Sequence, residues 1–303
     1  SKRSVRVMLN ALKGGTAELI TKGIFEPYKT TGLREPDYYH LTDKAKEELF
    51  PGMDLIQKDE QQDRRLIPYT SFAKKSLFYE TQVQTQIDRL AELLDKDRFT
   101  QVTQRLSELG MRKGFACLFY GSPGTGKTET VNQLARITGR DVMLVDVTKI
   151  KSCWVGESEQ NIKKLFDNYR SYVKKSEVAP ILLFNEADAI LGIRQESAER
   201  AVDKMENSIQ NIILQEMESL EGIMIATTNL TSNLDKAFER RFIYKIEFKR
   251  PSVEAKQMIW KSMIPSLSDE TALSLAKGYD LSGGQIENIA RKCTVEYILS
   301  GIE

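Results

Sequence analysis

Residues 121–128 have the types and spacing needed to hold a chain of phosphates. They fit the phosphate-binding loop pattern G-x-x-x-x-G-K-[ST]. Glycines let the backbone curl so that successive N–H groups point at an anion. Lys127 would reach the β- and γ-phosphates, and the Thr128 hydroxyl would ligate Mg²⁺. We therefore expect nucleotide contacts from the whole loop and from the residue after it: Gly121, Ser122, Pro123, Gly124, Thr125, Gly126, Lys127, Thr128 and Glu129.

The flanking sequence supplies the elements that such a loop requires. Residues 115–120 form a short apolar run, which is typical of a buried strand, and residues 129–138 have helical character before Gly139. A helix that begins near Gly126 would point the positive end of its dipole at the phosphates. The loop is therefore predicted to join a strand to a helix.

A second apolar strand, residues 181–184, ends in the polar sequence Asn185-Glu186-Ala187-Asp188. Ligands of open α/β sheets bind at such carboxyl ends of strands. The segment resembles a Walker B motif, in which an acidic pair holds Mg²⁺ and orients the attacking water. Glu186 matches the base. Asn185 stands where an aspartate is usual, and its amide offers Mg²⁺ an oxygen without a charge.

The rest of the chain alternates strands and helices. Apolar runs at 142–145, 180–184, 222–227 and 244–248 are separated by helical patterns at 159–173 and 202–218. This order predicts a doubly wound, parallel α/β core, with two amphipathic helices within 81–110 covering one face. After Pro251 the pattern is helical, which predicts a separate small domain.

The first 80 residues predict a small α+β module and a linker. Residues 1–50 read as a helix at 4–12, a helix at 17–21, a turn at 30–32, a strand at 38–42 and a helix at 43–50, an order that resembles part of a winged-helix domain. Its basic residues would face nucleic-acid phosphates, or simply solvent on a protein-binding or packing module. Residues 51–80 are expected to be a linker, in which Ile67 and Tyr69 would lie near the base of a nucleotide.

These motifs together resemble the AAA clade of the AAA+ ATPases, over about residues 65–303. The chain is similar to bacterial AAA-family ATPases that carry an N-terminal winged-helix-like module. The resemblance implies a P-loop NTPase nucleotide-binding domain at 81–250 and a helical lid domain at 251–303. It also implies ATP and Mg²⁺ as cofactors, hydrolysis of ATP to ADP and phosphate, and a ring of identical subunits, usually a hexamer.

The resemblance also assigns roles to individual residues. Asn229 matches sensor 1, which positions the attacking water, and Arg240 and Arg241 match arginine fingers that act on the ATP of a neighbouring subunit. Gly284, in the lid, would contact the nucleotide, and Gln285 replaces the acidic residue usual beside it. Trp154 and Val155 match pore loop 1, which would grip an extended protein substrate, and residues 192–200 stand where pore loop 2 lies. The catalytic set is therefore Glu186, Asn229, Arg240 and Arg241, and the metal ligands are Thr128 and Asn185.

Three functions follow from this assignment. The first is an ATPase ring that remodels or unfolds proteins. The second is a slow or inactive nucleotide-binding scaffold or switch, because of Asn185. The third is a nucleic-acid machine that uses residues 1–50, although 44 basic against 43 acidic residues give no general basic character.

Composition and chain ends set the expected compartment. No apolar run approaches the length of a membrane span and no signal peptide is visible, so a cytoplasmic protein that does not act on membranes is expected. Cys117, Cys153 and Cys293 are odd in number and are expected to be reduced. The chain begins with Ser1, so we expect a fragment or a processed protein.

Overall fold

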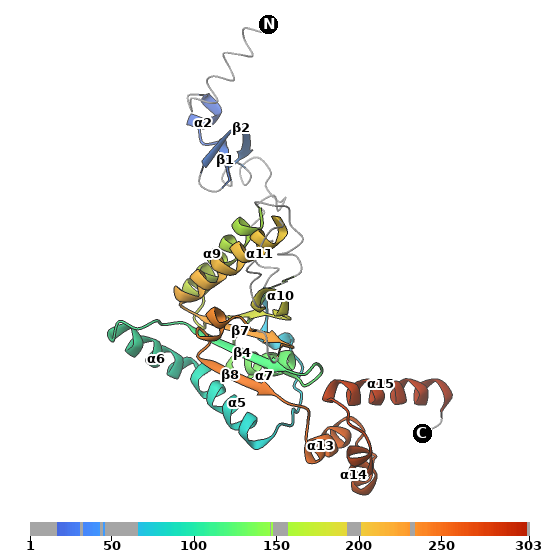
Figure 1. Ribbon diagram of the computed structural model, residues 1–303. Helices are drawn as coiled ribbons and strands as arrows, with labels where there is room; N and C mark the ends of the chain where they lie inside the picture. The colour runs from blue at the N-terminus through green and yellow to red at the C-terminus, as the bar shows by residue number, and fades with distance from the viewer. Residues whose placement is uncertain are drawn as a thin grey trace. The chain divides into compact units, whose positions relative to one another are not determined.

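A computed structural model describes residues 17–30, 33–42, 45, 66–145, 147, 157–192, 201–230 and 234–301. The chain divides into two units, residues 1–63 and residues 64–303 (Figure 1).

The described part of the first unit is a short helix and a two-stranded antiparallel sheet. Helix α2 (Glu18–Thr21) precedes β1 (Phe25–Thr30) and β2 (Leu33–Leu41). Residues 38–41 of the strand expected at 38–42 lie within β2, whereas β1 was not expected. The pairing register shifts just after Pro27, and a proline inside a short run weakens the sequence signal for a strand. The helices expected at 4–12 and 43–50 lie outside the described residues, Ala45 excepted, so the winged-helix interpretation stays a prediction.

The second unit is built on a sheet whose strands, among the described residues, follow the order β3-β5-β6-β7-β4-β8. The parallel strands are β4 (Phe115–Gly121), β5 (Val142–Val145), β6 (Ile181–Phe184), β7 (Ile223–Thr228) and β8 (Tyr244–Phe248). At one edge, β3 (Leu66–Ile67) pairs antiparallel with β5. Every residue of β6 and β7 is buried, as continuous apolar strands predict. The expected parallel α/β core is confirmed.

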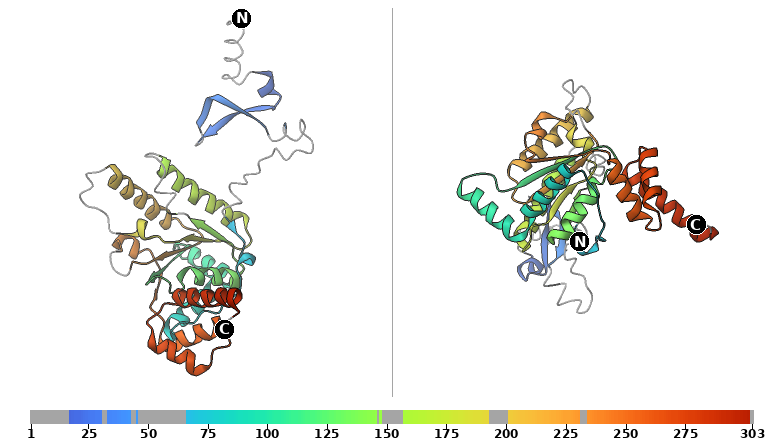
Figure 2. Two further views of the ribbon diagram at one scale, coloured as in Figure 1. Left: turned by 90° about the vertical axis from the view of Figure 1, so that its right-hand side faces the viewer. Right: turned by 90° about the horizontal axis from the view of Figure 1, so that it is seen from below.

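Helices cover both faces of this sheet (Figures 1 and 2). Successive strand residues point to opposite faces, so Leu118 and Met224 pack on one side, and Phe119 and Ile225 on the other. The first side is covered by α9 (Glu157–Lys175) and α11 (Ala201–Glu218). The second side is covered by α5 (Thr81–Leu94), α6 (Lys96–Glu108) and α7 (Lys127–Thr138). Two short helices, α10 (Asp188–Leu191) and α12 (Lys236–Glu239), follow β6 and β7.

Arg140 joins several elements on the α5–α6–α7 side. Its side chain is 1% exposed; Nε donates to the Leu94 carbonyl (2.8 Å) and a terminal nitrogen donates to the Ala179 carbonyl (2.6 Å). The guanidinium also lies 4.6 Å from the centre of the Phe99 ring. Burial lowers the pKa of Arg140 to about 10. Arg140 therefore links α5, α6 and the segment that enters β6.

Residues 66–80, which were expected to belong to a linker, are part of the second unit. After β3 come η1 (Tyr69–Ser71) and an extended segment, residues 72–80, which we call the strap. The strap runs along α7, because Gln133 Nε2 donates to the Ala73 carbonyl (2.8 Å) and Arg136 donates to the Phe72 carbonyl (3.0 Å). The sheet and its attachments therefore begin earlier than residue 81.

The chain after Pro251 is helical, as expected, and we call this segment the lid. Its helices are α13 (Val253–Met263), α14 (Asp269–Gly278) and α15 (Gly283–Ser300). Each begins after a serine whose hydroxyl accepts a hydrogen bond from the backbone N–H three residues later. Trp260, Ala272 and Ile286 form the small apolar core of the lid.

Candidate nucleotide-binding site

The loop between β4 and α7 has a backbone that only glycine accommodates at its key positions. Gly121, Gly124 and Gly126 have φ values of 134°, 73° and 93°. A Cβ at Gly121 would lie 2.2 Å from the Phe248 carbonyl oxygen, and one at Gly124 would lie 2.6 Å from Ser282 Oγ. Helix α7 begins at Lys127, directly after the loop, so its positive end faces the space that the loop encloses.

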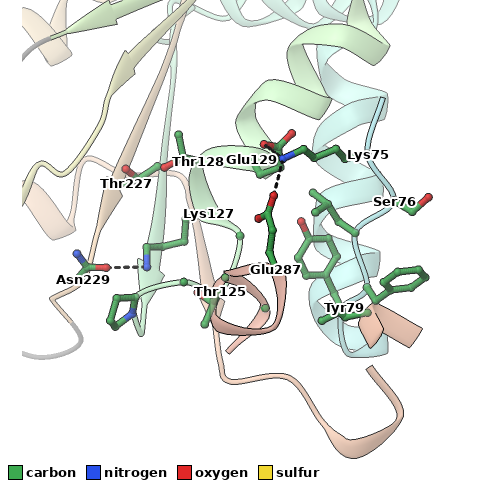
Figure 3. Close-up of a pocket in the computed structure, with 18 of the residues that line it drawn as sticks. Lys75, Ser76, Tyr79, Thr125, Lys127, Thr128, Glu129, Thr227, Asn229 and Glu287 are labelled. Carbon is green, nitrogen blue, oxygen red and sulfur yellow. Dashed lines mark hydrogen bonds and ion pairs between the residues drawn. The ribbon is translucent and has the colours of Figure 1, made fainter. Parts of the chain in front are cut away.

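The ammonium group of Lys127 is held inside this loop (Figure 3). The residue is 8% exposed, and Nζ donates to the carbonyls of Gly121 (2.8 Å) and Ser122 (2.8 Å) and to Asn229 Oδ1 (2.9 Å). Burial lowers the pKa of Lys127, and the carboxylate of Asp188 opposes that effect. All three N–H bonds of the ammonium are used, so a phosphate oxygen would take the place of one of these acceptors.

The two predicted metal ligands lie in contact with each other. Asn185 Oδ1 accepts hydrogen bonds from Thr128 Oγ1 (2.7 Å) and Thr227 Oγ1 (2.9 Å). These uncharged oxygens suit Mg²⁺ in type, so the donor set fits the ion. Among the described residues no cluster of three or more His, Cys, Asp or Glu side chains is found, so phosphate oxygens and water would have to complete the coordination.

Glu186 has a strained backbone at the carboxyl end of β6. Its φ is 53°, which is unusual for a residue with a side chain. Its N–H donates to Thr227 Oγ1 (3.1 Å) and the next N–H, of Ala187, donates to the Thr227 carbonyl (2.8 Å). These bonds to β7 stabilise a conformation that turns the exposed Glu186 into the cavity.

Asn229 is positioned by a residue to which the sequence analysis gave no role. Asn229, at the end of β7, donates from its backbone N to Asp188 Oδ1 (2.8 Å) and from Nδ2 to Asp188 Oδ2 (3.4 Å). Thr228 Oγ1 also donates to Asp188. The only signal in the sequence was the place of Asp188 in the polar end of the β6 motif.

A cavity of about 350 Å³ extends from the phosphate loop to the strap and the lid. Its far end carries a charged cluster, in which Lys75 Nζ lies 3.5 Å from a carboxylate oxygen of Glu129 and 3.4 Å from one of Glu287 (Figure 3). Ile259 and Met263 of α13 add apolar surface there. A cavity with a cationic loop at one end and apolar side chains at the other fits a nucleotide.

Ile67 and Tyr69, which were expected near the base, do not line this cavity. Ile67 pairs with Val142 in the sheet, and the backbone N of Tyr69 donates to Asp141 Oδ1 (3.0 Å). The strap takes their place, since Tyr79 lines the cavity, donates or accepts a hydrogen bond with Thr130, and packs edge-on against Phe248 at 5.7 Å.

The lid reaches the phosphate loop through two glycines. The N–H of Gly284 donates to the Gly124 carbonyl (2.9 Å), and a Cβ at Gly284 would lie 3.3 Å from the Gly124 Cα. Gln285 completes a capping box, because its side chain accepts from the Ser282 N–H (2.8 Å) while Ser282 Oγ accepts from the Gln285 N–H (3.3 Å). An amide performs this role as well as an acid, which explains the departure at 285.

Arg240 and Arg241 lie outside this cavity, and their side chains differ in burial and in contacts. Arg241 donates to the Ala237 carbonyl (2.7 Å) and pairs with Glu218, and its side chain is 13% exposed. The side chain of Arg240 is exposed and makes no hydrogen bond or ion pair within the described ranges. The proposed pore residues, Trp154 and Val155, and the segment at 193–200 lie outside the described residues.

Residues 117–250 match the family model "ATPase family associated with various cellular activities (AAA)". This part of the chain is an AAA ATPase domain. The match confirms the family that the phosphate loop and the β6 motif predicted, and it agrees with the parallel sheet described above.

Curated relatives of the AAA domain carry varied names. Protein CdcH of Halobacterium salinarum is 30% identical over 205 residues, which is 64% of this chain and 26% of that protein. A putative 26S proteasome regulatory subunit homolog of Methanocaldococcus jannaschii is 37% identical over 147 residues, 47% of this chain and 37% of that protein. The vesicle-fusing ATPase of Arabidopsis thaliana is 27% identical over 207 residues, 62% of this chain and 28% of that protein.

The chain therefore matches only between 26% and 37% of the length of these relatives. Within the described residues, no helix combines the length and the apolar character that a bilayer crossing requires.

Proposed function

We propose that the chain binds Mg²⁺-ATP at the β4–α7 loop, hydrolyses it, and uses the energy to remodel protein substrates as a ring of identical subunits. The observation that carries this proposal is the convergence of Lys127, Asn185, Glu186 and Asn229 at the carboxyl ends of β4, β6 and β7. These residues come from separate segments of the AAA domain and line or border one cavity. Such convergence at strand ends is typical of α/β nucleotide enzymes.

Each of these residues has a distinct task in the proposed reaction. Lys127 and the N–H groups of the loop bind the phosphates, and Glu186 accepts the proton of the attacking water. Asn229 holds that water or the γ-phosphate next to Lys127. Thr128 and Asn185 would hold Mg²⁺, which when bound neutralises charge on the phosphates.

The exposed Arg240 supports an assembly of several subunits. In the described part of its own chain the side chain has no partner, and it lies away from the cavity of that subunit. A positive charge that stabilises phosphoryl transfer in a neighbour requires a head-to-tail contact, and such contacts between identical subunits close into rings. We propose a hexamer, as the family resemblance implies.

Protein substrates are proposed from the names of relatives and from Trp154. One relative is named for the proteasome and another for vesicle fusion. Trp154→Ala is expected to keep basal ATPase activity and to remove its stimulation by an unfolded polypeptide, because an aromatic side chain grips many different sequences. Stimulation that survives in Trp154→Ala would contradict this assignment.

Steady-state ATP hydrolysis, measured against protein concentration, tests the enzymatic part of the proposal. Turnover per subunit should rise with concentration and vanish in Glu186→Gln, which should still bind ATP. Glu177→Gln is the matched control, since Glu177 is an exposed carboxylate paired with Lys96, outside the cavity. Wild-type turnover in Glu186→Gln would remove Glu186 from the mechanism.

A nucleotide-dependent switch is the second candidate, because Asn185 offers Mg²⁺ no negative charge. Tight ATP binding without turnover at any protein concentration would favour it. Salt-dependent DNA binding by the protein would instead favour the nucleic-acid interpretation of residues 1–50.

A further inference from the structure

Asp188 is a partly buried carboxylate that follows β6 and makes its hydrogen bonds to residues at the end of β7. It is the first residue of α10, yet its hydrogen bonds run to the neighbouring strand. Oδ1 accepts from the backbone N of Asn229 (2.8 Å) and from Thr228 Oγ1, and Oδ2 faces Asn229 Nδ2 (3.4 Å). Its carboxylate therefore holds the backbone and side chains of Thr228 and Asn229 at the end of β7.

These contacts fix which way the Asn229 amide points. A carboxylate only accepts hydrogen bonds, so it selects the NH₂ end of the amide. The oxygen end must then face away from Asp188, and it accepts from Lys127 Nζ (2.9 Å). The three side chains form an ordered chain from carboxylate through amide to ammonium, which we call the Asp188–Asn229–Lys127 chain.

The carboxylate is itself held in place. Thr228 is 1% exposed, and its hydroxyl donates to Asp188 while accepting from the Leu230 N–H (3.1 Å). Both functions of that hydroxyl are therefore used, and it holds one geometry. Because the carboxylate is fixed in this way, its hydrogen bonds also fix the position of the Asn229 amide.

We infer that Asp188 is a positioning residue for ATP hydrolysis, which acts by holding the Asn229 amide with its oxygen toward Lys127 and the phosphates. The inference rests on the proposed function for its effect on turnover. Without Asp188 the amide is free to rotate by about 180°, because the two ends of an amide have nearly the same shape. An NH₂ group would then face the ammonium, and the polar groups around the reacting phosphate would lose their order.

The test compares Asp188→Ala and Asp188→Asn with Asp95→Ala as the matched control. Asp95 is likewise a carboxylate that accepts from the backbone, here from the N–H groups of Asp97 and Arg98, but it lies at the start of α6, outside the cavity. We expect Asp188→Ala to lower kcat by about 10- to 100-fold, while the Kd for ATP changes by less than about 3-fold. Asp188→Asn, which keeps the shape and one acceptor oxygen, should have an intermediate kcat, and Asp95→Ala should keep kcat.

A double variant distinguishes positioning from a general structural effect. If Asp188 acts through Asn229, Asp188→Ala/Asn229→Ala should turn over no more slowly than Asn229→Ala alone. The inference would be overturned if the kcat losses of the two single variants multiply in the double variant. It would also be overturned if the Kd of Asp188→Ala for ATP rises by as large a factor as its kcat falls. If Asp188→Ala does not fold, the kcat of Asp188→Asn decides in the same way, and a wild-type value would overturn the inference.

A binding readout keeps the inference testable if the wild-type protein shows no turnover, which would refute the proposed function. Asn229 faces the terminal phosphate in the proposed complex, so its disorder should weaken ATPγS more than ADP. We expect Asp188→Ala and Asn229→Ala to lower the preference for ATPγS over ADP by the same factor, about 2- to 3-fold. An unchanged preference in Asp188→Ala, beside a lowered one in Asn229→Ala, would overturn the role of Asp188.

Discussion

Arg240 and Arg241 are adjacent in sequence, but the structure predicts opposite consequences when each is changed to alanine. Arg241→Ala removes a hydrogen bond to the Ala237 carbonyl and an ion pair with Glu218. The bond contributes about 1 kcal/mol and the partly exposed pair about 0.5 kcal/mol, with a further contribution from the packed stem. Removal of the buried, unpaired Nε offsets part of this loss. We expect a net destabilisation of about 1–2 kcal/mol, or about 2–8 °C in Tm.

Arg240→Ala removes an exposed side chain, so the free energy of unfolding should change by less than about 0.5 kcal/mol. If Arg240 stabilises the transition state in a neighbouring subunit, kcat should fall by about 1,000-fold. Thermal unfolding and steady-state ATPase assays, carried out on the same preparations, separate the two effects.

Mixing two inactive variants tests whether Arg240 acts between subunits. Glu186→Gln subunits still carry Arg240, and Arg240→Ala subunits still carry Glu186. In a ring mixed at random from equal amounts, about a quarter of the sites would combine Glu186 with a neighbour's Arg240, and that share of wild-type activity should return. No recovery on mixing would refute action in trans. A lower Tm in Arg240→Ala together with a lower kcat in Arg241→Ala would reverse the two assignments.

Three further predictions follow from the structure. Asn185→Asp should lower the Mg²⁺ concentration that gives half-maximal ATP hydrolysis by about 10-fold, because it adds a negative charge beside Thr128; an unchanged Mg²⁺ titration would remove residue 185 from the metal site. Arg140→Met should destabilise the protein by about 2–4 kcal/mol in urea unfolding, since it leaves the Leu94 and Ala179 carbonyls without their donor, while wild-type stability would show that water replaces the guanidinium. Burial raises the pKa of Cys117 from 9.0 to about 12, so between these pH values the thiol is protonated in the folded state and ionised in the unfolded state. The free energy of unfolding should therefore fall between about pH 9 and 12, and it should fall less steeply in Cys117→Val.

The phosphate loop, the strand before it and the helix after it were predicted correctly because their signals are local. Residues 115–138 carry an apolar run, a glycine pattern and a helical pattern within one short stretch. The same holds for the buried strands β6 and β7, whose apolar sequence is continuous. Such patterns arise from the backbone periodicity of each element, which a single sequence contains.

The contacts that complete the cavity could not be predicted in this way, because they join distant parts of the chain. Lys75 and Glu287 lie 212 positions apart, and neither belongs to a recognised motif. The strand β3 is only two residues long, too short for a periodic signal, so the strap behind it was taken for a linker. Arg140 follows Gly139 as an ordinary charged residue in sequence, and only the packed structure shows that it is buried.

The hydrogen bond between Gly284 and Gly124 couples the orientation of α15 to the position of the phosphate loop. Helix α15 begins at that bond and continues for 18 residues. At about 1.5 Å per residue its length is about 27 Å, so a rotation of about 10° at the phosphate loop displaces its far end by about 5 Å. The two glycines are joined backbone to backbone, so a displacement of the loop moves the start of the helix directly, with no flexible side chain between them. The exposed residues Tyr297, Ile298 and Leu299 lie at the end with the largest displacement.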